Sequence, residues 1–276
     1  MEVFPPAFPY GGRRRLGLEG KVEDFVRTSR KVTGVADLFL VAAVRSPSSA
    51  LMSTVQGAIL LGDRLGVDAS PTIVVRRTEK AQVRSSIATS LAMGLSSVTL
   101  VWGDRTPEAG VSRDCAYPSL SDAIADAAAF ARKHGARLRI LAPVDLSALD
   151  SERGVALALG RIRAGADFLL AQPPTTDSGP TFERHFALLR RAGVRGKVLL
   201  SVFPFMGEED VQRVEGSFGW ALPQSLHTLS RSGRGALIRE ARQTFLRISS
   251  SPLPGVYVST RGDPSAALRI LGEDRA

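Results

Sequence analysis

Three polar side chains stand at the ends of apolar, strand-like runs, where they could take part in chemistry. Glu2 lies in the short run Glu2–Phe4, Asp104 directly follows the run that ends Trp102-Gly103, and Gln172 ends the run Phe168–Gln172. If these runs are parallel strands of one barrel, all three side chains project from its carboxyl-terminal rim. Barrel enzymes place their catalytic groups at that rim, so this arrangement predicts an enzyme.

Each of the three residues has two interpretations. Glu2 is either a frayed or capping carboxylate near the chain end, or a general acid kept protonated by the apolar residues that follow it. Asp104 could be an ordinary turn aspartate, but the next helix is expected only near residues 119–121, too far away for Asp104 to cap it. At a rim, its carboxylate could accept two hydrogen bonds from the amidine-like edge of a pterin. Gln172 must satisfy its amide with either backbone or ligand partners.

Apolar runs recur at eight places, and segments with helical periodicity lie between them. The runs cover residues 2–4, 38–44, 72–76, 98–101, 138–144, 168–172, 198–203 and 255–259. Their near-continuous apolar character suits strands buried on both faces, and their strict alternation with helices predicts a parallel sheet with right-handed crossovers. We therefore predict an α/β fold, a single (β/α)₈ (TIM) barrel domain over residues 1–276, with an extra helix around 235–248 before the last strand. A doubly wound open sheet is the alternative, but Pro5 and Pro6 stand where that fold usually has a glycine-rich loop.

The charge of the chain suits an anionic partner. A formal net charge of +9 on 276 residues would be consistent with a nucleic-acid-binding protein. However, basic residues alternate with acidic ones along the helical segments, and aromatic residues make up only 6% of the chain, so no platform for stacking bases is evident. A basic surface also suits a dinucleotide or a polycarboxylate tail. We predict a small-molecule ligand and no nucleic-acid partner.

Other features exclude further classes of protein. No apolar run reaches the roughly 18 uncharged residues that a membrane helix needs, and Pro5 and Pro6 interrupt the place where a signal peptide has its apolar core. The single cysteine, Cys115, excludes an internal disulfide, and the three histidines lack ligand spacing, so no metal site is predicted. We expect a cytoplasmic protein that binds no membrane.

Several strand-end motifs together resemble the methylenetetrahydrofolate reductase family, with this chain as a divergent, archaeal-type member. Glu2-Val3-Phe4-Pro5-Pro6 is similar to the family's first-strand Glu-Phe-Phe-Pro-Pro, and Gly103-Asp104 to the end of its strand-four Arg-Gly-Asp. Ala164-Gly165-Ala166-Asp167-Phe168, leading to Gln172, resembles its sixth-strand Ala-Gly-Ala-Asp-Phe…Gln. Pro204 and the segment Trp220–Pro223 are similar to later motifs. The resemblance covers the whole chain in the right order.

The resemblance implies an oxidoreductase of one-carbon metabolism and methionine biosynthesis. Such an enzyme reduces a 5,10-methylene-tetrahydropterin, either tetrahydrofolate or an archaeal analogue, to the 5-methyl form. In that family hydride passes from NAD(P)H through bound FAD, so the chain would be a flavoprotein. The family's roles would fall to Glu2 as general acid, Asp104 as the group that holds the pterin near the flavin, and Gln172 as a further pterin contact. A homo-oligomer is a further expectation.

The chain departs from that family mainly where the flavin would bind. Ala42-Ala43-Val44 stands in place of a Thr-Tyr pair at strand two, and Trp102 replaces the arginine before Gly-Asp. The cofactor-binding candidates that remain are Trp102, Gly103, Arg161, Arg45 and Arg76. The family's helix before strand one is also missing, which puts the assigned start of the chain in question. A flavin-free pterin-binding protein that acts in one-carbon transfer within a complex is the alternative function, and a basic nucleic-acid-binding protein is the third.

Overall fold

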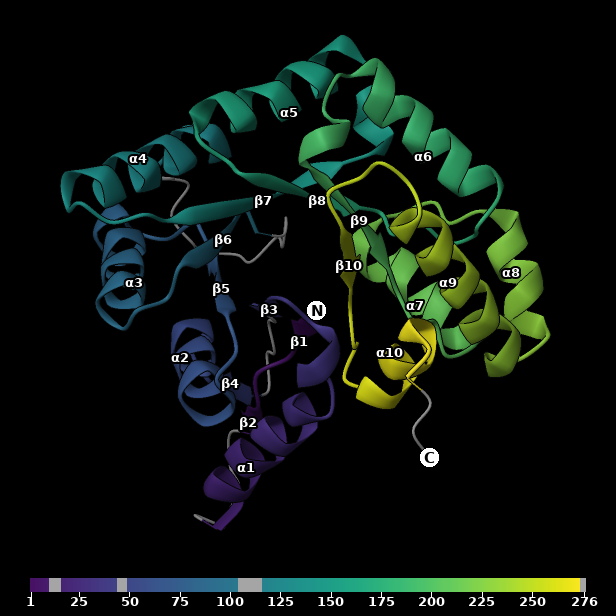
Figure 1. Cartoon of the computed structure of the whole chain (residues 1–276), viewed down its shortest axis with the longest axis horizontal. Helices are drawn as coiled ribbons and strands as arrows, with labels where there is room; N and C mark the ends of the chain where they lie inside the picture. Colours follow the sequence, from purple (N-terminus) through teal and green to yellow (C-terminus); the bar gives the residue numbers. More distant parts are fainter. Residues whose placement is uncertain (10–15, 44–48, 104–115, 274–276) are drawn as a thin grey trace. The chain divides into compact units, whose positions relative to one another are not determined.

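The computed structural model describes residues 1–9, 16–43, 49–103 and 116–273. In this part of the chain eight strands form one sheet in the order β1-β3-β5-β6-β7-β8-β9-β10 (Figure 1), and the strand pairs whose register is defined are all parallel. The strands are β1 Glu2–Val3, β3 Phe39–Val41, β5 Ala69–Val74, β6 Ser97–Val101, β7 Arg139–Asp145, β8 Phe168–Gln172, β9 Val198–Val202 and β10 Val256–Val258. Sequence order equals strand order, as repeated βα units require.

Helices alternate with these strands. They are α1 Leu16–Arg30, α2 Thr54–Leu65, α3 Lys80–Ala92, α4 Leu120–Lys133, α5 Glu152–Ala164, α6 Pro180–Arg191, α7 Glu208–Phe218, α8 Gln224–Arg231, α9 Arg234–Ser249 and α10 Pro264–Leu271. Three short 3₁₀ helices are η1 Thr33–Val35, η2 Ser147–Asp150 and η3 Arg195–Lys197. The predicted (β/α)₈ barrel fold class is confirmed, and the extra helix predicted around 235–248 is α9.

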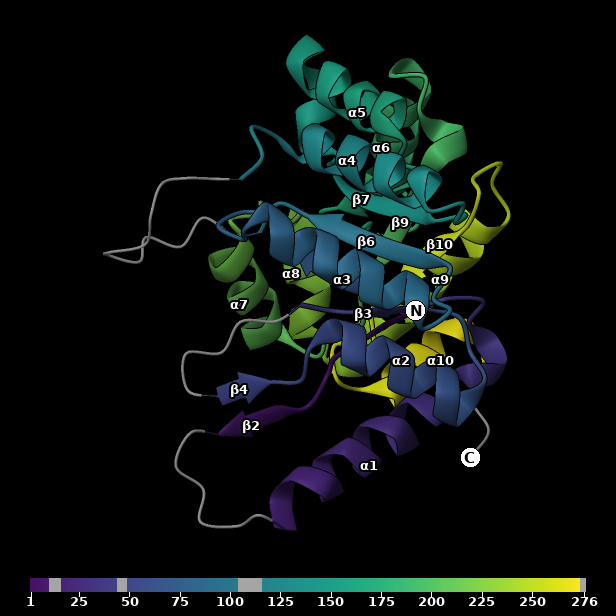
Figure 2. The same cartoon turned by 90° about the vertical axis from the view of Figure 1, so that its left-hand side faces the viewer.

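Two strands and one helix were not predicted. The strands β2 Ala7–Pro9 and β4 Ser49–Leu51 pair with each other in antiparallel orientation and form a separate two-stranded ribbon (Figure 2). They lie just beyond the carboxyl ends of β1 and β3, where Pro5 and Pro6 interrupt the first strand. The helix α8 was also missed. Its eight residues include only two large apolar side chains, Leu226 and Leu229, too few for a distinct helical pattern.

The chain divides into two compact units. The first comprises Met1–Ala142 and Gly160–Asp167, and the second comprises Pro143–Leu159 and Phe168–Ala276. Strand β7 therefore contributes its first residues to one unit and its last residues to the other. We describe each unit by itself.

In the first unit, helices cover one face of the strands (Figure 1): α2 packs against β3 and β5, and α3 and α4 pack against β6. The largest side chains buried there are Phe39, Leu61, Ile87, Leu100, Ile124, Ile140 and Leu141. Burial of each such side chain contributes about 1.5–3 kcal/mol. The near-continuous apolar strands that the sequence displays are thus explained by burial on both faces.

In the second unit, α9 packs against β9 and β10, and α8 and α10 pack against α9. Its largest buried side chains are Leu146, Leu149, Leu169, Leu189 and Leu200. The last helix begins where the sequence predicts: the Asp263 carboxylate accepts a hydrogen bond from the backbone N–H of Ala266 (3.1 Å), and Pro264 occupies the first helical position. The connection from β10 to α10 is therefore short and capped.

Candidate functional site at the carboxyl ends of the strands

Glu2 lies in the first strand, where it pairs with Leu40 of β3. Glu2 is partly exposed, whereas the next residue, Val3, is only 4% exposed. The amino group of Met1 donates a hydrogen bond to the carbonyl of Leu38 (2.7 Å). Burial lowers the pKa of this amino group to about 6, and the charge of Glu2 opposes that shift. Glu2 is therefore part of a short strand that is firmly paired at its start.

The end of β6 carries Trp102 and Gly103, both partly exposed. The backbone N–H of Arg76 donates to the carbonyl of Trp102 (2.9 Å), so the pairing of β5 and β6 continues to this point. Gly103 has a φ of +94°, and a Cβ there would lie 2.7 Å from a methyl group of Val74. Only glycine fits, which explains the Gly-Asp sequence at this strand end. Asp104 itself, like Arg45, lies outside the described residues.

Arg76 and Arg161 are the other two predicted cofactor contacts. Arg76 lies at the carboxyl ends of the strands and Arg161 at the amino ends. Arg76 follows β5 at its carboxyl end and is partly exposed. Arg161 lies in the last turn of α5, and its carbonyl accepts from Ala166, just before Asp167 pairs with Ile140 near the start of β7. Helix ends that lead into a strand belong to the amino ends of the strands. Arg161 is thus away from the carboxyl ends, where the other candidates lie.

The motif Ala164–Phe168 has a structural role. The carboxylate of Asp167 accepts a hydrogen bond from the backbone N–H of Ile140 (2.8 Å), and the carbonyl of Ile140 accepts one from the N–H of Asp167 (2.8 Å). Gly165 has a φ of +117°, and a Cβ there would lie 3.1 Å from Ala128. These residues join a helix end to a strand.

Gln172 is the last residue of β8 and is partly exposed. Its backbone carbonyl accepts a hydrogen bond from the N–H of Leu146 (2.7 Å). Its side-chain amide has no hydrogen-bond partner among the described residues. A partly exposed amide at a strand end, with its donors and acceptor unused, is available to a ligand.

The loop after β8 is held by a buried carboxylate that the sequence analysis missed. Asp177 is 6% exposed and accepts hydrogen bonds from the backbone N–H groups of Gly179 (3.1 Å) and Thr181 (3.0 Å). It also accepts from the hydroxyls of Thr181 (2.8 Å) and Ser225 (3.1 Å). This network holds the start of α6 and joins it to α8.

Aromatic side chains and a cation lie after β9 and β10. The ring of Phe203 lies 6.3 Å from that of Phe205 and 6.1 Å from that of Trp220. The guanidinium of Arg261 lies 5.7 Å from the centre of the Phe203 ring and donates to the buried carboxylate of Asp210 (2.7 Å). Arg261 has a φ of +46°, an uncommon conformation for a residue with a side chain. Arg261 was not among the site residues predicted from the sequence.

This second-unit cluster combines a cation with aromatic side chains. Arg261 has five N–H donors, of which one is used by Asp210, and its side chain is 15% exposed. The ring of Phe203 beside it is buried, and Trp220 is partly exposed. Loops after the last two strands of a (β/α)₈ barrel commonly bind phosphate or other anions. Gln172, Arg261 and the aromatic residues are therefore the described groups best placed for ligand recognition.

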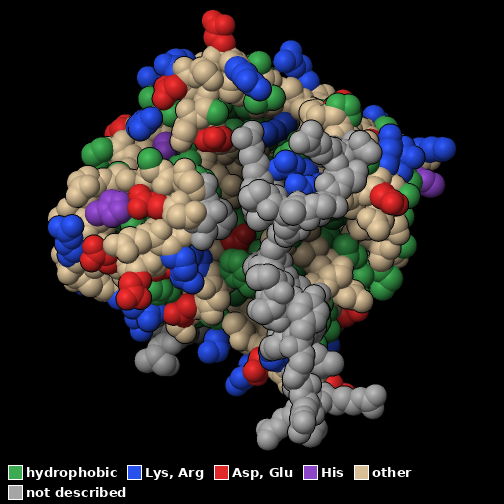
Figure 3. Space-filling model, turned by 180° about the vertical axis from the view of Figure 1, so that it is seen from behind, with side chains coloured by type: hydrophobic (Ala, Val, Ile, Leu, Met, Phe, Trp, Pro, Cys, Tyr) green, Lys and Arg blue, Asp and Glu red, His purple; other side chains and the backbone are tan. Residues whose placement is uncertain are grey.

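Three further observations concern metal ions, membrane spans and surface charge. Among the described residues, no group of three His, Cys, Asp or Glu side chains is arranged to hold a metal ion. None of the described helices is long and apolar enough to span a membrane. On the face that Figure 3 presents, basic and acidic side chains are interspersed rather than gathered into one patch.

The fold and the strand-end residues define a protein of the (β/α)₈ barrel class. No protein-family model matches the chain, and no curated protein matches it. Among solved structures, the chain is similar to an uncharacterized protein from Clostridium thermocellum that binds two copies of 5-methyl-5,6,7,8-tetrahydrofolic acid. The TM-score is 0.67 at 10% sequence identity, over 99% of this chain and 91% of that one. The chain is also similar to oxaloacetate acetylhydrolase, with a TM-score of 0.52 and 13% identity, over 89% of this chain and 75% of that one. These likenesses establish the fold.

Proposed function

We propose that this protein is an enzyme that binds a reduced folate or a related tetrahydropterin at the carboxyl ends of its strands. The side-chain amide of Gln172 has no hydrogen-bond partner among the described residues and stands at the strand end where the family resemblance expects a pterin contact. This observation carries the proposal. The similar fold of a protein that binds 5-methyl-tetrahydrofolic acid supports it. Arg261, beside the ring of Phe203, suits a ligand with an aromatic part and a carboxylate.

The reaction that we propose is reduction of a 5,10-methylene-tetrahydropterin to the 5-methyl form, with hydride from NAD(P)H. Glu2 donates a proton to the nitrogen that leaves the bridging carbon, which opens the ring to an iminium. Hydride then adds to the iminium carbon. Gln172 holds the pterin, and Asp104, which lies outside the described residues, is the proposed second contact to its amidine edge. A carboxylic acid in apolar surroundings is suited to this proton transfer.

FAD is the hydride carrier that the family resemblance implies, and it stays a prediction. When bound, it would accept hydride from NAD(P)H and pass it to the substrate. Trp102 and Gly103 at the end of β6 and Arg76 after β5 are the described candidates to contact it. Arg76 already has an interaction partner within the chain. The cytoplasmic location and the homo-oligomer also stay predictions.

A flavin-free pterin-binding protein of one-carbon transfer is the second candidate. The first unit favours it, because the described strand end after β3 offers only Ala42 and Ala43, and β5 continues into buried Val75. These residues provide few polar groups for a dinucleotide. Such a protein would bind the methyl or methylene pterin without oxidising NAD(P)H.

The test has two measurements on the purified protein. The first is a calorimetric titration with 5-methyl-tetrahydrofolate, for which we expect saturable binding. The second is the visible spectrum after incubation with FAD and removal of unbound cofactor, followed by addition of NADH or NADPH. Retained flavin that bleaches, and is reoxidised by methylene-tetrahydrofolate, would support the reductase. Folate binding without retained flavin or NAD(P)H oxidation would support the second candidate, and no folate binding would contradict both.

A further inference from the structure

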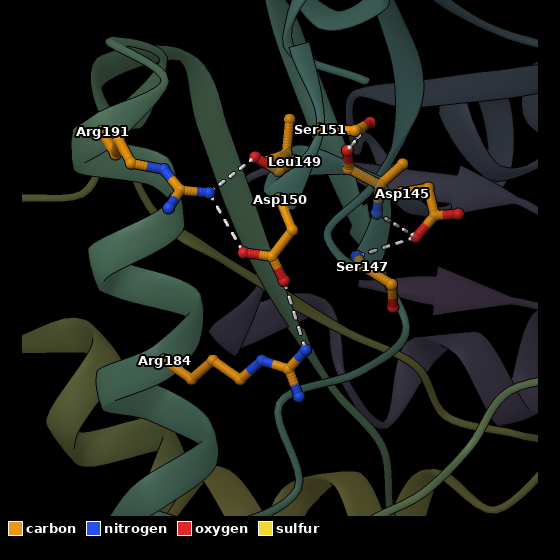
Figure 4. Close-up of polar contacts among 8 residues, drawn as sticks. Asp145, Ser147, Leu149, Asp150, Ser151, Arg184 and Arg191 are labelled. Carbon is orange, nitrogen blue, oxygen red and sulfur yellow. Dashed lines mark hydrogen bonds and ion pairs between the residues drawn. The ribbon is translucent and has the colours of Figure 1, made fainter. Parts of the chain in front are cut away.

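A groove on the second unit lies between η2 and α6 (Figure 4). It has a volume of about 500 Å³ and is lined by Asp150, Arg184, Ala187, Leu188, Arg190 and Arg191. That volume is typical of small-molecule sites. The lining shares no residue with the site at Gln172, and the last turn of α6 leads through η3 into β9, at the amino ends of the strands. The groove is therefore a second candidate site.

Two arginines of α6 converge on one carboxylate in this groove (Figure 4). A side-chain nitrogen of Arg191 lies 3.0 Å from Oδ1 of Asp150, and one of Arg184 lies 3.4 Å from Oδ2. Arg184, Ala187 and Arg191 are three or four residues apart, so they share one face of α6, and the small Ala187 leaves space between the two long side chains. Because each guanidinium reaches a different oxygen of one carboxylate, the two are arranged to hold a single oxyanion.

The position of Arg191 does not depend on Asp150 alone. Arg191 also donates a hydrogen bond to the backbone carbonyl of Leu149 in η2 (3.3 Å). The η2 turn itself packs closely on α5, because a Cβ at Gly154 would lie 1.9 Å from the carbonyl oxygen of Ala148. Arg191 therefore keeps a partner on a closely packed turn when the Asp150 carboxylate moves away.

The groove is positively charged. Three guanidinium groups and one carboxylate line it, which leaves a net charge of +2. The guanidinium of Arg190 has no hydrogen bond or ion pair among the described residues. The side chains of Arg184, Arg191 and Asp150 are 67%, 62% and 52% exposed. Exposed ion pairs contribute little to stability, so another anion can replace the Asp150 carboxylate at small cost. An esterified phosphate, with a charge of about −1.5 to −2 at pH 7 and three acceptor oxygens, matches this arrangement.

We propose that this groove binds a phosphate group, either free or as the monoester of a small molecule. The phosphate takes the place of the Asp150 carboxylate between Arg184 and Arg191, and Arg190 supplies the third guanidinium. Arginine binds phosphate through charge-assisted, often bidentate hydrogen bonds. Asp150 competes with the phosphate for two of these arginines, so its substitution and theirs should have opposite effects. The site does not depend on the proposed function.

The experiment is a calorimetric titration of the full chain with inorganic phosphate and with phenyl phosphate at pH 7.5 and low ionic strength. We expect saturable binding that added salt weakens. The pair Arg184→Gln/Arg191→Gln should lower the affinity about tenfold, since each exposed charge pair contributes roughly a two- to fivefold gain. Arg190→Gln breaks no internal bond and should lower it less, whereas Asp150→Asn should raise it. Arg239→Gln, an equal loss of charge on the exposed side of α9, is the matched control.

The two probes separate the sources of the phosphate group. Tighter binding of phenyl phosphate would assign the site to a phosphate monoester, and equal or weaker binding would assign it to free phosphate. Absence of saturable binding with both probes, or affinities unchanged in Arg190→Gln and in the pair Arg184→Gln/Arg191→Gln, would overturn the proposal. A lowered affinity in Asp150→Asn would also overturn it, because the carboxylate would then support the arginines rather than compete for them.

Discussion

Two polar residues of one sequence motif, Asp167 and Gln172, stand at the two ends of β8. They differ in their hydrogen bonding. At the amino end, the carboxylate of Asp167 is bound to the backbone N–H of Ile140. At the carboxyl end, the amide of Gln172 has no partner among the described residues. A polar side chain with internal partners stabilises the fold, whereas one left without partners at a strand end is free to bind a ligand. The comparison indicates that the Asp167 end of the motif is structural and leaves the Gln172 end as the one that we propose binds the ligand.

The largest effect is expected at Glu2. If it is the proton donor, Glu2→Gln should lower the rate of methylene-tetrahydrofolate reduction by roughly 10²–10⁴-fold, because general acid catalysis contributes that much. NAD(P)H oxidation that depends on methylene-tetrahydrofolate measures the rate. Glu19→Gln, on an exposed helical position, is the control. An unchanged rate in a folded Glu2→Gln protein would remove Glu2 from the mechanism.

Asp177, like Asp167, has internal hydrogen-bond partners, so its substitution should lower the stability of the fold. Asp177→Ala removes the acceptor of four hydrogen bonds in a buried network, so we expect it to lower the free energy of unfolding by about 3–5 kcal/mol. Urea denaturation measures this loss. Ser225→Ala, which removes only one of the four donors, should cost about 1 kcal/mol. Similar stabilities for Asp177→Ala and Ser225→Ala would show that the network is unimportant.

His185 links this structural network to pH. The imidazole is buried, and its Nδ1 lies 3.1 Å from the hydroxyl of Thr175. Burial, with a smaller contribution from Arg184 and against the attraction of Asp177, lowers its pKa from 6.5 to about 4. The stability that comes from a neutral His185 is therefore fully present above pH 6.5 and is lost as the pH falls to 4. This loss is about 3 kcal/mol at 1.36 kcal/mol per pKa unit.

The measurement for His185 is urea denaturation at pH 7.5 and at pH 4.5 for the wild type and His185→Asn. The variant should lose much less stability between the two pH values than the wild type does, because asparagine does not titrate. Equal pH dependence in both proteins would show that other groups cause the loss.

Asp167 should show a smaller structural effect. Asp167→Ala leaves the N–H of Ile140 without its partner, so we expect a loss of about 1–2 kcal/mol in the free energy of unfolding. The folded variant should bind 5-methyl-tetrahydrofolate as tightly as the wild type. A weakened affinity at full folding would show that the amino end of β8 also serves the ligand, and would break the comparison.

Much of the fold follows from the sequence, because buried parallel strands need apolar runs and helices reveal themselves by periodicity. The strands that carry Glu2 and Gln172 were located in that way. Arg261 could not be identified, since its partner Asp210 lies 51 residues away and their pairing depends on tertiary structure. Asp177 was detectable in principle: an aspartate shortly before Gly179-Pro180 is typical of a helix start, and proline favours the first helical position.

The most direct test of the account is the affinity of Gln172→Ala for 5-methyl-tetrahydrofolate, measured by calorimetry beside wild type and Gln212→Ala, an exposed glutamine of α7. Because the amide of Gln172 has no described internal partner, its loss should leave the free energy of unfolding within about 0.5 kcal/mol of wild type. We expect the affinity to fall about tenfold, or about 1.4 kcal/mol, while the control binds normally. Unchanged affinity of Gln172→Ala, or a loss of stability in place of a loss of binding, would contradict the assignment of this strand end as the folate site.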